Sequence, residues 1–167
     1  MAAGATYDKI ATTTLGSAAS SITFSSIAAS WTDLRLVLVD LDSNTSTQFI
    51  QFNGSTATNY SFTVLSGDGT ASSSSALTSN ASISLGSWFG ASTTIPNFST
   101  VDIFSYAGST YKTSLVSNSY DANGSGGTYR SVALWSSTAA ITSILISRST
   151  GTFNTGTSAT LYGIKAA

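Results

Sequence analysis

Apolar and polar residues alternate along most of this chain, which is the pattern of β-strands with one buried face. The alternation is clean in Ser21-Ile22-Thr23-Phe24-Ser25. Two further runs, Val101–Ser105 and Ser143–Ser147, carry apolar residues on both faces, which suits a sandwich interior or a subunit interface. Valine, isoleucine, threonine, serine, glycine and aromatic residues dominate, and they favour strands over helices. We therefore predict an all-β protein.

The alternating runs are separated by turn signals such as Asn53-Gly54 and the glycine-rich segment 121–127. Short strands at this spacing predict an antiparallel β-sandwich, and a jelly roll of two packed sheets is the form that we favour. The strands are predicted at residues 6–15, 20–27, 33–41, 47–53, 59–66, 81–88, 99–106, 111–119, 128–136, 141–148 and 158–164.

We expect residues 1–167 to form a single β-sandwich domain, because a chain of this length can bury a sizeable core. The low-complexity run 70–76 offers no large side chain to bury. We predict it to be an exposed loop between the sheets, since patterned strands resume around Ile83 and Leu85.

The composition argues against catalysis. Histidine and cysteine are absent and no glutamate occurs, which removes the usual groups for proton transfer near neutral pH and for thiol chemistry. Charged residues make up only 8% of the chain, against about 25% in an average soluble domain. A surface with so little charge is best explained if other subunits cover much of it. We predict a protein that is not an enzyme and has no cofactor.

The basic residues are dispersed and are balanced by aspartates to a net charge of -1, so we expect no nucleic-acid partner. They are Lys9, Arg35, Lys112, Arg130, Arg148 and Lys165. The sequence contains no apolar run near the length of about 18 residues that a membrane span needs, and its start lacks the features of a signal peptide. We expect no membrane partner and synthesis in a cytoplasm.

One stretch opens like a calcium-binding loop. Asp40, Asp42 and Asn44 place oxygen-bearing side chains at alternate positions. Thr45 stands where the loop needs glycine, and Gln51 where it needs a bidentate glutamate. We interpret the acidic residues as the solvated exit of an apolar strand and predict no metal site.

Two hydrolytic arrangements are possible on residue counts alone. A serine nucleophile could use Lys9, Lys112 or Lys165 as its base, but none lies in a Ser-x-x-Lys motif. We interpret these lysines as solubilising edge charges. Asp40 and Asp42 are close in sequence, but alternate residues of a strand share one face and cannot flank a glycosidic bond. We predict no catalytic residue.

Aromatic residues offer a third type of site. Trp31, Trp88 and Trp135, together with seven tyrosines, could form a platform on which a sugar stacks. Trp88 and Trp135 follow alternating apolar runs and are more simply explained as sheet core or strand ends.

Several phrases in order along the chain resemble a family of bacteriophage virion proteins built on a jelly-roll domain. They are Ser21-Ile22-Thr23-Phe24-Ser25-Ser26-Ile27, Trp31-Thr32-Asp33-Leu34-Arg35-Leu36-Val37-Leu38, Phe52-Asn53-Gly54 with Asn59-Tyr60-Ser61, the run Leu134–Ile144, and Ala159-Thr160-Leu161-Tyr162-Gly163-Ile164. The chain departs from the pattern at Ala28-Ala29, where a proline is expected, and at Asp40-Leu41-Asp42, where basic residues are expected.

The resemblance implies a non-enzymatic structural protein of the virion. The function that it implies most directly is that of a capsid decoration or cement protein on the capsid surface. Such a protein is expected to be a homotrimer whose partner is the major capsid protein of a phage head. The alternative is a tail, baseplate or head-fibre component that binds a receptor or a glycan. The resemblance fixes no partner-binding residue. Residues 1–6 are uncharged, and we hypothesise that they form an arm that adds an edge strand to a neighbour.

Overall fold

The structure is a computed structural model that describes residues 6–42, 46–86 and 92–165. The described residues form strands, turns and loops without a helix. The strands are β1 (Tyr7–Thr14), β2 (Ser21–Phe24), β3 (Asp33–Asp42), β4 (Gln48–Phe52), β5 (Tyr60–Gly67), β6 (Ser72–Asn80), β7 (Ile83–Gly86), β8 (Ser92–Phe104), β9 (Lys112–Asp121), β10 (Gly126–Trp135), β11 (Ile144–Arg148) and β12 (Ser158–Ile164).

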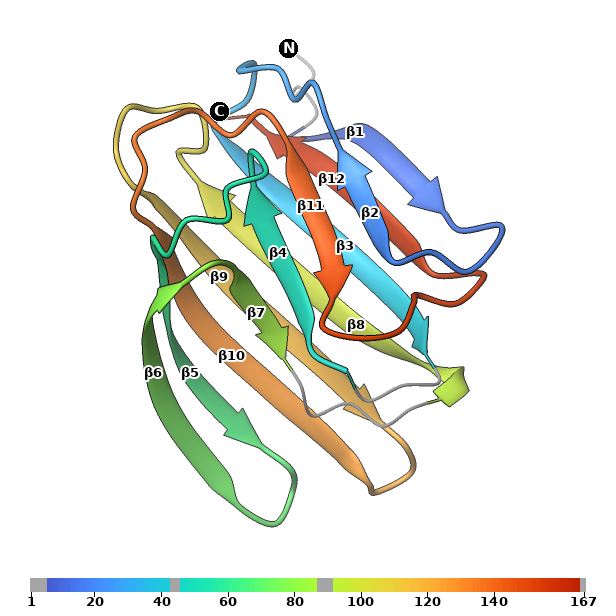
Figure 1. Ribbon diagram of the computed structural model, residues 1–167. Coiled ribbons are helices and arrows are strands. Elements are labelled where there is room, and N and C mark those ends of the chain that lie inside the picture. Colours follow the sequence, from blue (N-terminus) through green and yellow to red (C-terminus); the bar gives the residue numbers. More distant parts are fainter. Residues whose placement is uncertain (1–5, 43–45, 87–91, 166–167) are drawn as a thin grey trace.

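Two antiparallel sheets of unequal width make a β-sandwich, which confirms the predicted fold class (Figure 1). The larger sheet has eight strands in the order β1-β12-β3-β8-β9-β10-β5-β6. The smaller sheet has four strands in the order β2-β11-β4-β7 and lies in front of the larger one in Figure 1. The hairpin of β5 and β6 extends past the smaller sheet at the lower left of that view.

The core fills the space between the sheets and is built by the alternation seen in the sequence. Leu34, Leu36 and Leu38 of β3 are fully buried, whereas the residues between them face outward and are half-buried. Ile50 on β4 and Ile146 on β11 fill the opposite side of the core. A strand turns successive side chains to opposite faces, so each alternating run supplies one row of the core.

Each predicted strand is found, with changed ends. The run predicted from residue 99 begins at Ser92 as β8, and Pro96 lies where the pairing of β3 with β8 shifts register between Asp40 and Asp42. A proline is tolerated in a strand at such a bulge. The predicted turn at Asn53-Gly54 also occurs, and both residues have positive φ.

The prediction of an exposed loop at residues 70–76 is wrong. Most of this run belongs to β6, which pairs with β5 from Gly67 opposite Ser72 to Phe62 opposite Leu77. The side chains of β6 are exposed, as predicted, up to Ser79. The strand therefore exists because its backbone completes hydrogen bonds with β5, and not because it buries side chains of its own.

Candidate interaction surface

A row of apolar side chains lies exposed on the outer face of the larger sheet. It consists of Leu65, Phe104, Tyr111, Leu115 and Val132, which we call the apolar stripe. These side chains are between 40% and 59% exposed. Aromatic and branched aliphatic residues exposed together on one face are typical of an interaction site.

The strand register places four members of the apolar stripe next to one another, and the fifth, Tyr111, directly precedes β9. Val132 on β10 lies directly opposite Leu115 on β9. Phe104 on β8 is opposite Thr113, so it is diagonal to Leu115. Leu65 on β5 is opposite Arg130, so it is diagonal to Val132. Diagonal neighbours on one face are close enough for long side chains to touch, and the stripe therefore crosses from β8 to β5 without a break.

The sequence carried a signal for this stripe that alternation alone does not show. Four of its members stand beside an inward-facing apolar residue, in the pairs Val64-Leu65, Ile103-Phe104, Leu115-Val116 and Val132-Ala133. Since a strand sends neighbouring side chains to opposite faces, one residue of each pair must point outward. Adjacent apolar residues within an alternating strand thus predict an apolar outer face.

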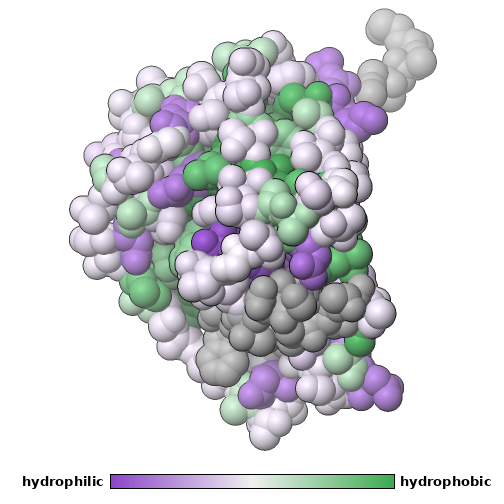
Figure 2. All heavy atoms as spheres, turned by 45° about the vertical axis from the view of Figure 1, so that its right-hand side comes forward, coloured by the Kyte–Doolittle hydropathy of each residue, from purple (hydrophilic) through white to green (hydrophobic). Residues whose placement is uncertain are grey.

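Few charges accompany the stripe. Arg130 is exposed within it, and Arg35 on β3 pairs with Asp102 on β8, with Nε 2.6 Å from Oδ1. This pairing raises the pKa of Arg35. On the side of the molecule in Figure 2, hydrophilic residues form isolated purple spots among white and pale green atoms. The face in this view therefore carries few strongly hydrophilic side chains.

An aromatic and polar cluster extends from the stripe towards the β1 edge of the same sheet, and its Asp102 lies opposite Leu115. Tyr7 on β1 and Tyr162 on β12 meet edge to face, with ring centroids 6.4 Å apart. The guanidinium of Arg35 lies 5.8 Å from the centroid of the Tyr7 ring and donates a hydrogen bond to the Tyr7 hydroxyl. Tyr7 is half exposed. We call Tyr7, Tyr162, Arg35 and Asp102 the tyrosine cluster.

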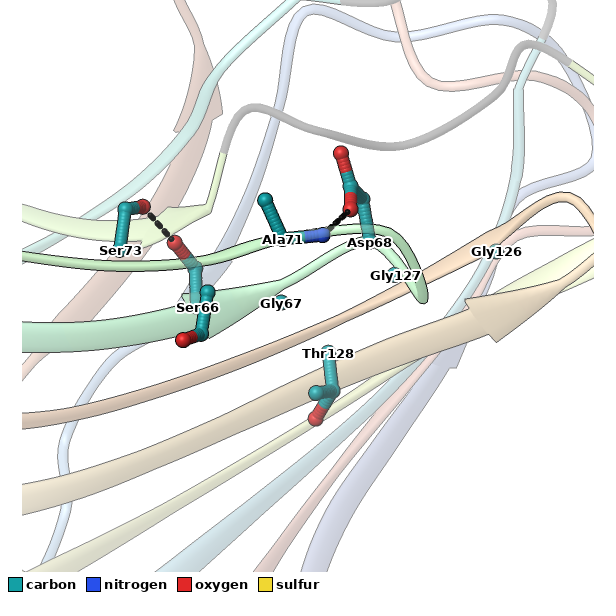
Figure 3. Close-up of a pocket in the computed structure, with 9 residues that line it drawn as sticks. Ser66, Gly67, Asp68, Ala71, Ser73, Gly126, Gly127 and Thr128 are labelled. Atoms are coloured by element: carbon teal, nitrogen blue, oxygen red, sulfur yellow. Dashed lines mark hydrogen bonds between the residues drawn. The ribbon is translucent and has the colours of Figure 1, made fainter.

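A small hollow lies where the β5–β6 turn meets the start of β10 (Figure 3). Its volume is about 190 Å³. The hydroxyls of Ser66 and Ser73, which both line it, are 2.9 Å apart. Asp68 is the ionisable residue among the described residues that line the hollow. Its carboxylate accepts hydrogen bonds from the backbone N–H groups of Thr70 and Ala71. These bonds lower its pKa and commit the carboxylate to its own turn.

The structure corrects the interpretation of Asp40 as a solvated strand exit. Asp40 is buried and accepts hydrogen bonds from Arg148, Gln48 and Thr157 at 2.9, 2.6 and 3.0 Å. Burial raises the pKa of Asp40 and lowers that of Arg148, because both charges have left water. Arg148 comes from β11, far away in sequence, so local reasoning could not find it.

The stretch that opens like a calcium-binding loop is only partly described. The side chain of Asp42 and all of Asn44 and Thr45 lie outside the described residues, and Gln51 instead donates to the carbonyl of Ala81. Within the part of the chain that the structure describes, no group of three or more metal-binding side chains is found.

One of the three lysines contradicts its predicted role as an edge charge. Lys112 is fully buried, and its ammonium donates hydrogen bonds to the backbone carbonyls of Gly108, at 2.6 Å, and of Thr110. Burial lowers its pKa. Lys9 is exposed on β1, and Lys165 pairs with Asp8 at 2.5 Å, which lowers the pKa of Asp8.

The two described tryptophans, Trp31 and Trp135, do not form a common platform. Trp135 is buried, and its ring stacks on Tyr60 with centroids 6.1 Å apart. Trp31 is half-buried and donates its indole N–H to Asp8. Trp88 lies outside the described residues. Exposed aromatic surface is found instead at the tyrosine cluster and in the apolar stripe.

Comparisons with known proteins add no assignment. The described residues form no helix long and apolar enough to cross a membrane. The chain matches no protein-family model, no curated protein and no solved structure.

Proposed function

We propose that this protein is a non-enzymatic structural component of a bacteriophage virion, a capsid decoration or cement protein that binds the major capsid protein of the assembled head. The observation that carries the proposal is the apolar stripe on the outer face of the larger sheet. The resemblance of the colinear sequence phrases to phage virion proteins supplies the biological setting.

The engagement of the charged groups supports a structural role. Asp40 pairs with Arg148, and Asp102 with Arg35. Asp33 and Asp121, like Asp68, accept hydrogen bonds from backbone N–H groups. Carboxylates committed in this way position strands and turns, and they are poorly placed to act as acids or bases on a ligand.

We further propose that the sandwich is a jelly roll with an inserted hairpin and two further strands added beside β3. Without β1, β12 and the β9–β10 hairpin, the larger sheet reads β3-β8-β5-β6 and the smaller one β2-β11-β4-β7. The chain then crosses between the sheets as two interlocked Greek keys do. The hairpin widens the face that carries most of the apolar stripe.

A protein of this kind stabilises a shell by mass action. It binds the assembled shell and not the separate subunits, so its binding free energy adds to the stability of the shell. Several copies or several contacts per particle raise the avidity without new chemistry. An apolar stripe with few charges fits such permanent contact, because charged residues are depleted at the core of interfaces.

Fractionated particles of the phage that encodes the chain test this proposal. Heads and tails are separated, and each fraction is searched for peptides of the protein by mass spectrometry. We expect the peptides in the head fraction. Peptides confined to the tail fraction, or missing from particles, would refute the assignment to the head.

The docking face is tested with purified protein and heads that lack it. The variant Leu115→Asp/Val132→Asp places two charges in the apolar stripe, and we expect it to bind at least about tenfold more weakly. The matched control Ser21→Asp/Thr23→Asp adds the same charges at exposed positions of β2, on the other sheet, and should bind like the wild type. Equal binding by both variants would exclude the stripe.

The tyrosine cluster favours a second function, glycan binding by a tail, baseplate or head-fibre component. An exposed tyrosine beside an arginine and a carboxylate offers a ring for stacking and polar groups for sugar hydroxyls. The test is binding of host-surface oligosaccharides to the purified protein. Saturable binding that is lost in Tyr7→Ala, and kept in the control Tyr111→Ala, would support this function over capsid decoration.

A further inference from the structure

Two strands close the ends of the larger sheet, and they differ in how their outer edges are protected. β1 carries Asp8 and Lys9, and its pairing with β12 is interrupted by a bulge between Lys9 and Ala11. Charges and bulges are the devices by which natural edge strands avoid pairing with another strand. The edge at β1 is therefore protected.

The edge at β6 lacks this protection over most of its length. The stretch Ser72–Leu77 reads Ser-Ser-Ser-Ser-Ala-Leu and contains no charge and no proline. It keeps a regular register with β5, and the shift comes only beyond Leu77. Since one side of β6 pairs with β5, the backbone groups of its other side point out of the sheet. We call this stretch the serine edge.

We propose that the serine edge pairs with the serine edge of a second copy of this chain, antiparallel about a two-fold axis. The pairing joins two eight-stranded sheets through their backbones. Neither copy brings a charge into the contact, so no like charges meet. Two-fold pairing sets each strand against a copy of itself, with residue i opposite residue j and j opposite i, which an uncharged strand of small hydroxyl side chains accepts.

The structure already contains the side-chain contact that such pairing would repeat. On the protein's own β5–β6 pair, the hydroxyls of Ser66 and Ser73 are 2.9 Å apart. The serine edge of a second copy offers Ser72–Ser75 as partners for the same kind of hydroxyl contact. A strand of another protein binds a sheet edge specifically when pockets beside the edge hold its side chains. A row of small serine side chains offers little to build such pockets. A second copy is therefore the occupant that the edge fits best.

Pairing at the serine edge would also enlarge the docking face. β5, which carries Leu65 of the apolar stripe, is the neighbour of β6. A two-fold axis perpendicular to the joined sheet keeps the outer faces of both copies on one side, so their stripes lie on one continuous surface. Only this consequence rests on the proposed function, and the pairing itself does not. A two-fold contact gives pairs, whereas the resemblance implies a trimer.

The mass of the full chain in solution tests the proposal. Light scattering at a protein concentration of about 100 µM suits a contact of this small size. We expect the wild type to have the mass of two chains, and Ser74→Lys/Ser75→Lys to have the mass of one. The control Thr12→Lys/Thr14→Lys adds the same charges at exposed positions of β1 and should leave the mass of two chains.

A second measurement does not depend on the folding of the lysine variant. The chain has no cysteine, so Ser74→Cys introduces a single thiol, and oxidation should link most of the protein into dimers. Thr14→Cys, its control on β1, should stay largely unlinked. The pairing would be overturned if the wild type had the mass of one chain or of three. Equal disulfide linking of Ser74→Cys and Thr14→Cys would also overturn it. Loss of head binding in the stripe variant would still support the proposed function in that case.

Discussion

The buried ion pair between Asp40 and Arg148 offers the sharpest test of the energetics of this sandwich. Both side chains are only 1% exposed. Arg148 donates to Oδ2 of Asp40 at 2.9 Å and also to the hydroxyl and carbonyl oxygens of Ser46. The substitution Arg148→Met keeps most of the side-chain volume and removes the charge. It leaves the carboxylate of Asp40 buried with only Gln48 and Thr157 as described hydrogen-bond donors.

We expect Arg148→Met to lower the free energy of unfolding at pH 7 by about 3–5 kcal/mol, the usual cost of breaking a buried pair from one side. That is a large share of the total of about 5–15 kcal/mol for a domain. With a urea m-value of about 2 kcal/mol per molar, the midpoint should fall by about 2 M. Urea unfolding followed by tryptophan fluorescence measures it, because Trp135 is buried in the core.

The pH dependence separates a charge effect from a packing effect. Burial already raises the pKa of Asp40 in the folded protein above its usual value of 3.8, and loss of the cation should raise it further. Protonation of Asp40 then favours the folded state, so this contribution is complete below pH 3.8 and is lost as the pH rises through the folded pKa. Each unit by which the pKa of Asp40 rises in the folded state changes the free energy of unfolding by about 1.4 kcal/mol across this pH range.

The difference in stability between Arg148→Met and the wild type should therefore shrink as the pH falls from 7 towards 4. Asp40→Asn/Arg148→Met, which removes both charges, should be less destabilised at pH 7 than the single variant. Arg130→Met, at an exposed arginine, should change stability by no more than about 0.5 kcal/mol. A deficit that is the same at both pH values and in the double variant would refute the role of the buried charge.

Two further perturbations probe packing and the contact between the sheets. A Cβ on Gly163 would lie 2.3 Å from the ring of Trp31, so Gly163→Ala should cost about 1–3 kcal/mol in urea unfolding, whereas Gly16→Ala, with open space around it, should cost nothing measurable. Asn118 donates to the carbonyl of Leu85 at 3.0 Å across the sandwich. Asn118→Ala should cost about 1–3 kcal/mol and speed hydrogen exchange in β7, and unchanged exchange there would contradict a role in holding that strand.

The alternation of residues predicted most of the fold because it reports directly on burial. It failed at β6, where Ser73 and Ser75 give no alternation and the strand depends on hydrogen bonds to β5. It also failed at Asp40, whose environment is set by Arg148 on a strand about a hundred residues later in the chain. Long-range polar contacts of this kind leave no local pattern.

The candidate interaction surface was only partly accessible from sequence. The low charge density predicted that the protein meets other surfaces, and adjacent pairs such as Ile103-Phe104 required an apolar residue on the outer face. The order of strands in the sheet was needed to show that Phe104, Leu115 and Val132 are neighbours. The interpretation of Trp135 as sheet core is confirmed, since a large aromatic residue at the end of an alternating run fills the core.

The pairing of β1 with β12 also decides how the domain would respond to a pulling force. Tyr7 lies opposite Ile164, and the N–H of Lys165 donates to the carbonyl of Thr6 at 3.1 Å. Thr6 and Lys165 therefore meet at one corner of the sandwich, where the outermost strand pair β1–β12 ends. A force applied between them would open the hydrogen bonds of this pair one after another, as in a zipper, and would not shear them all at once. The domain should yield at low force from this corner while its core stays folded.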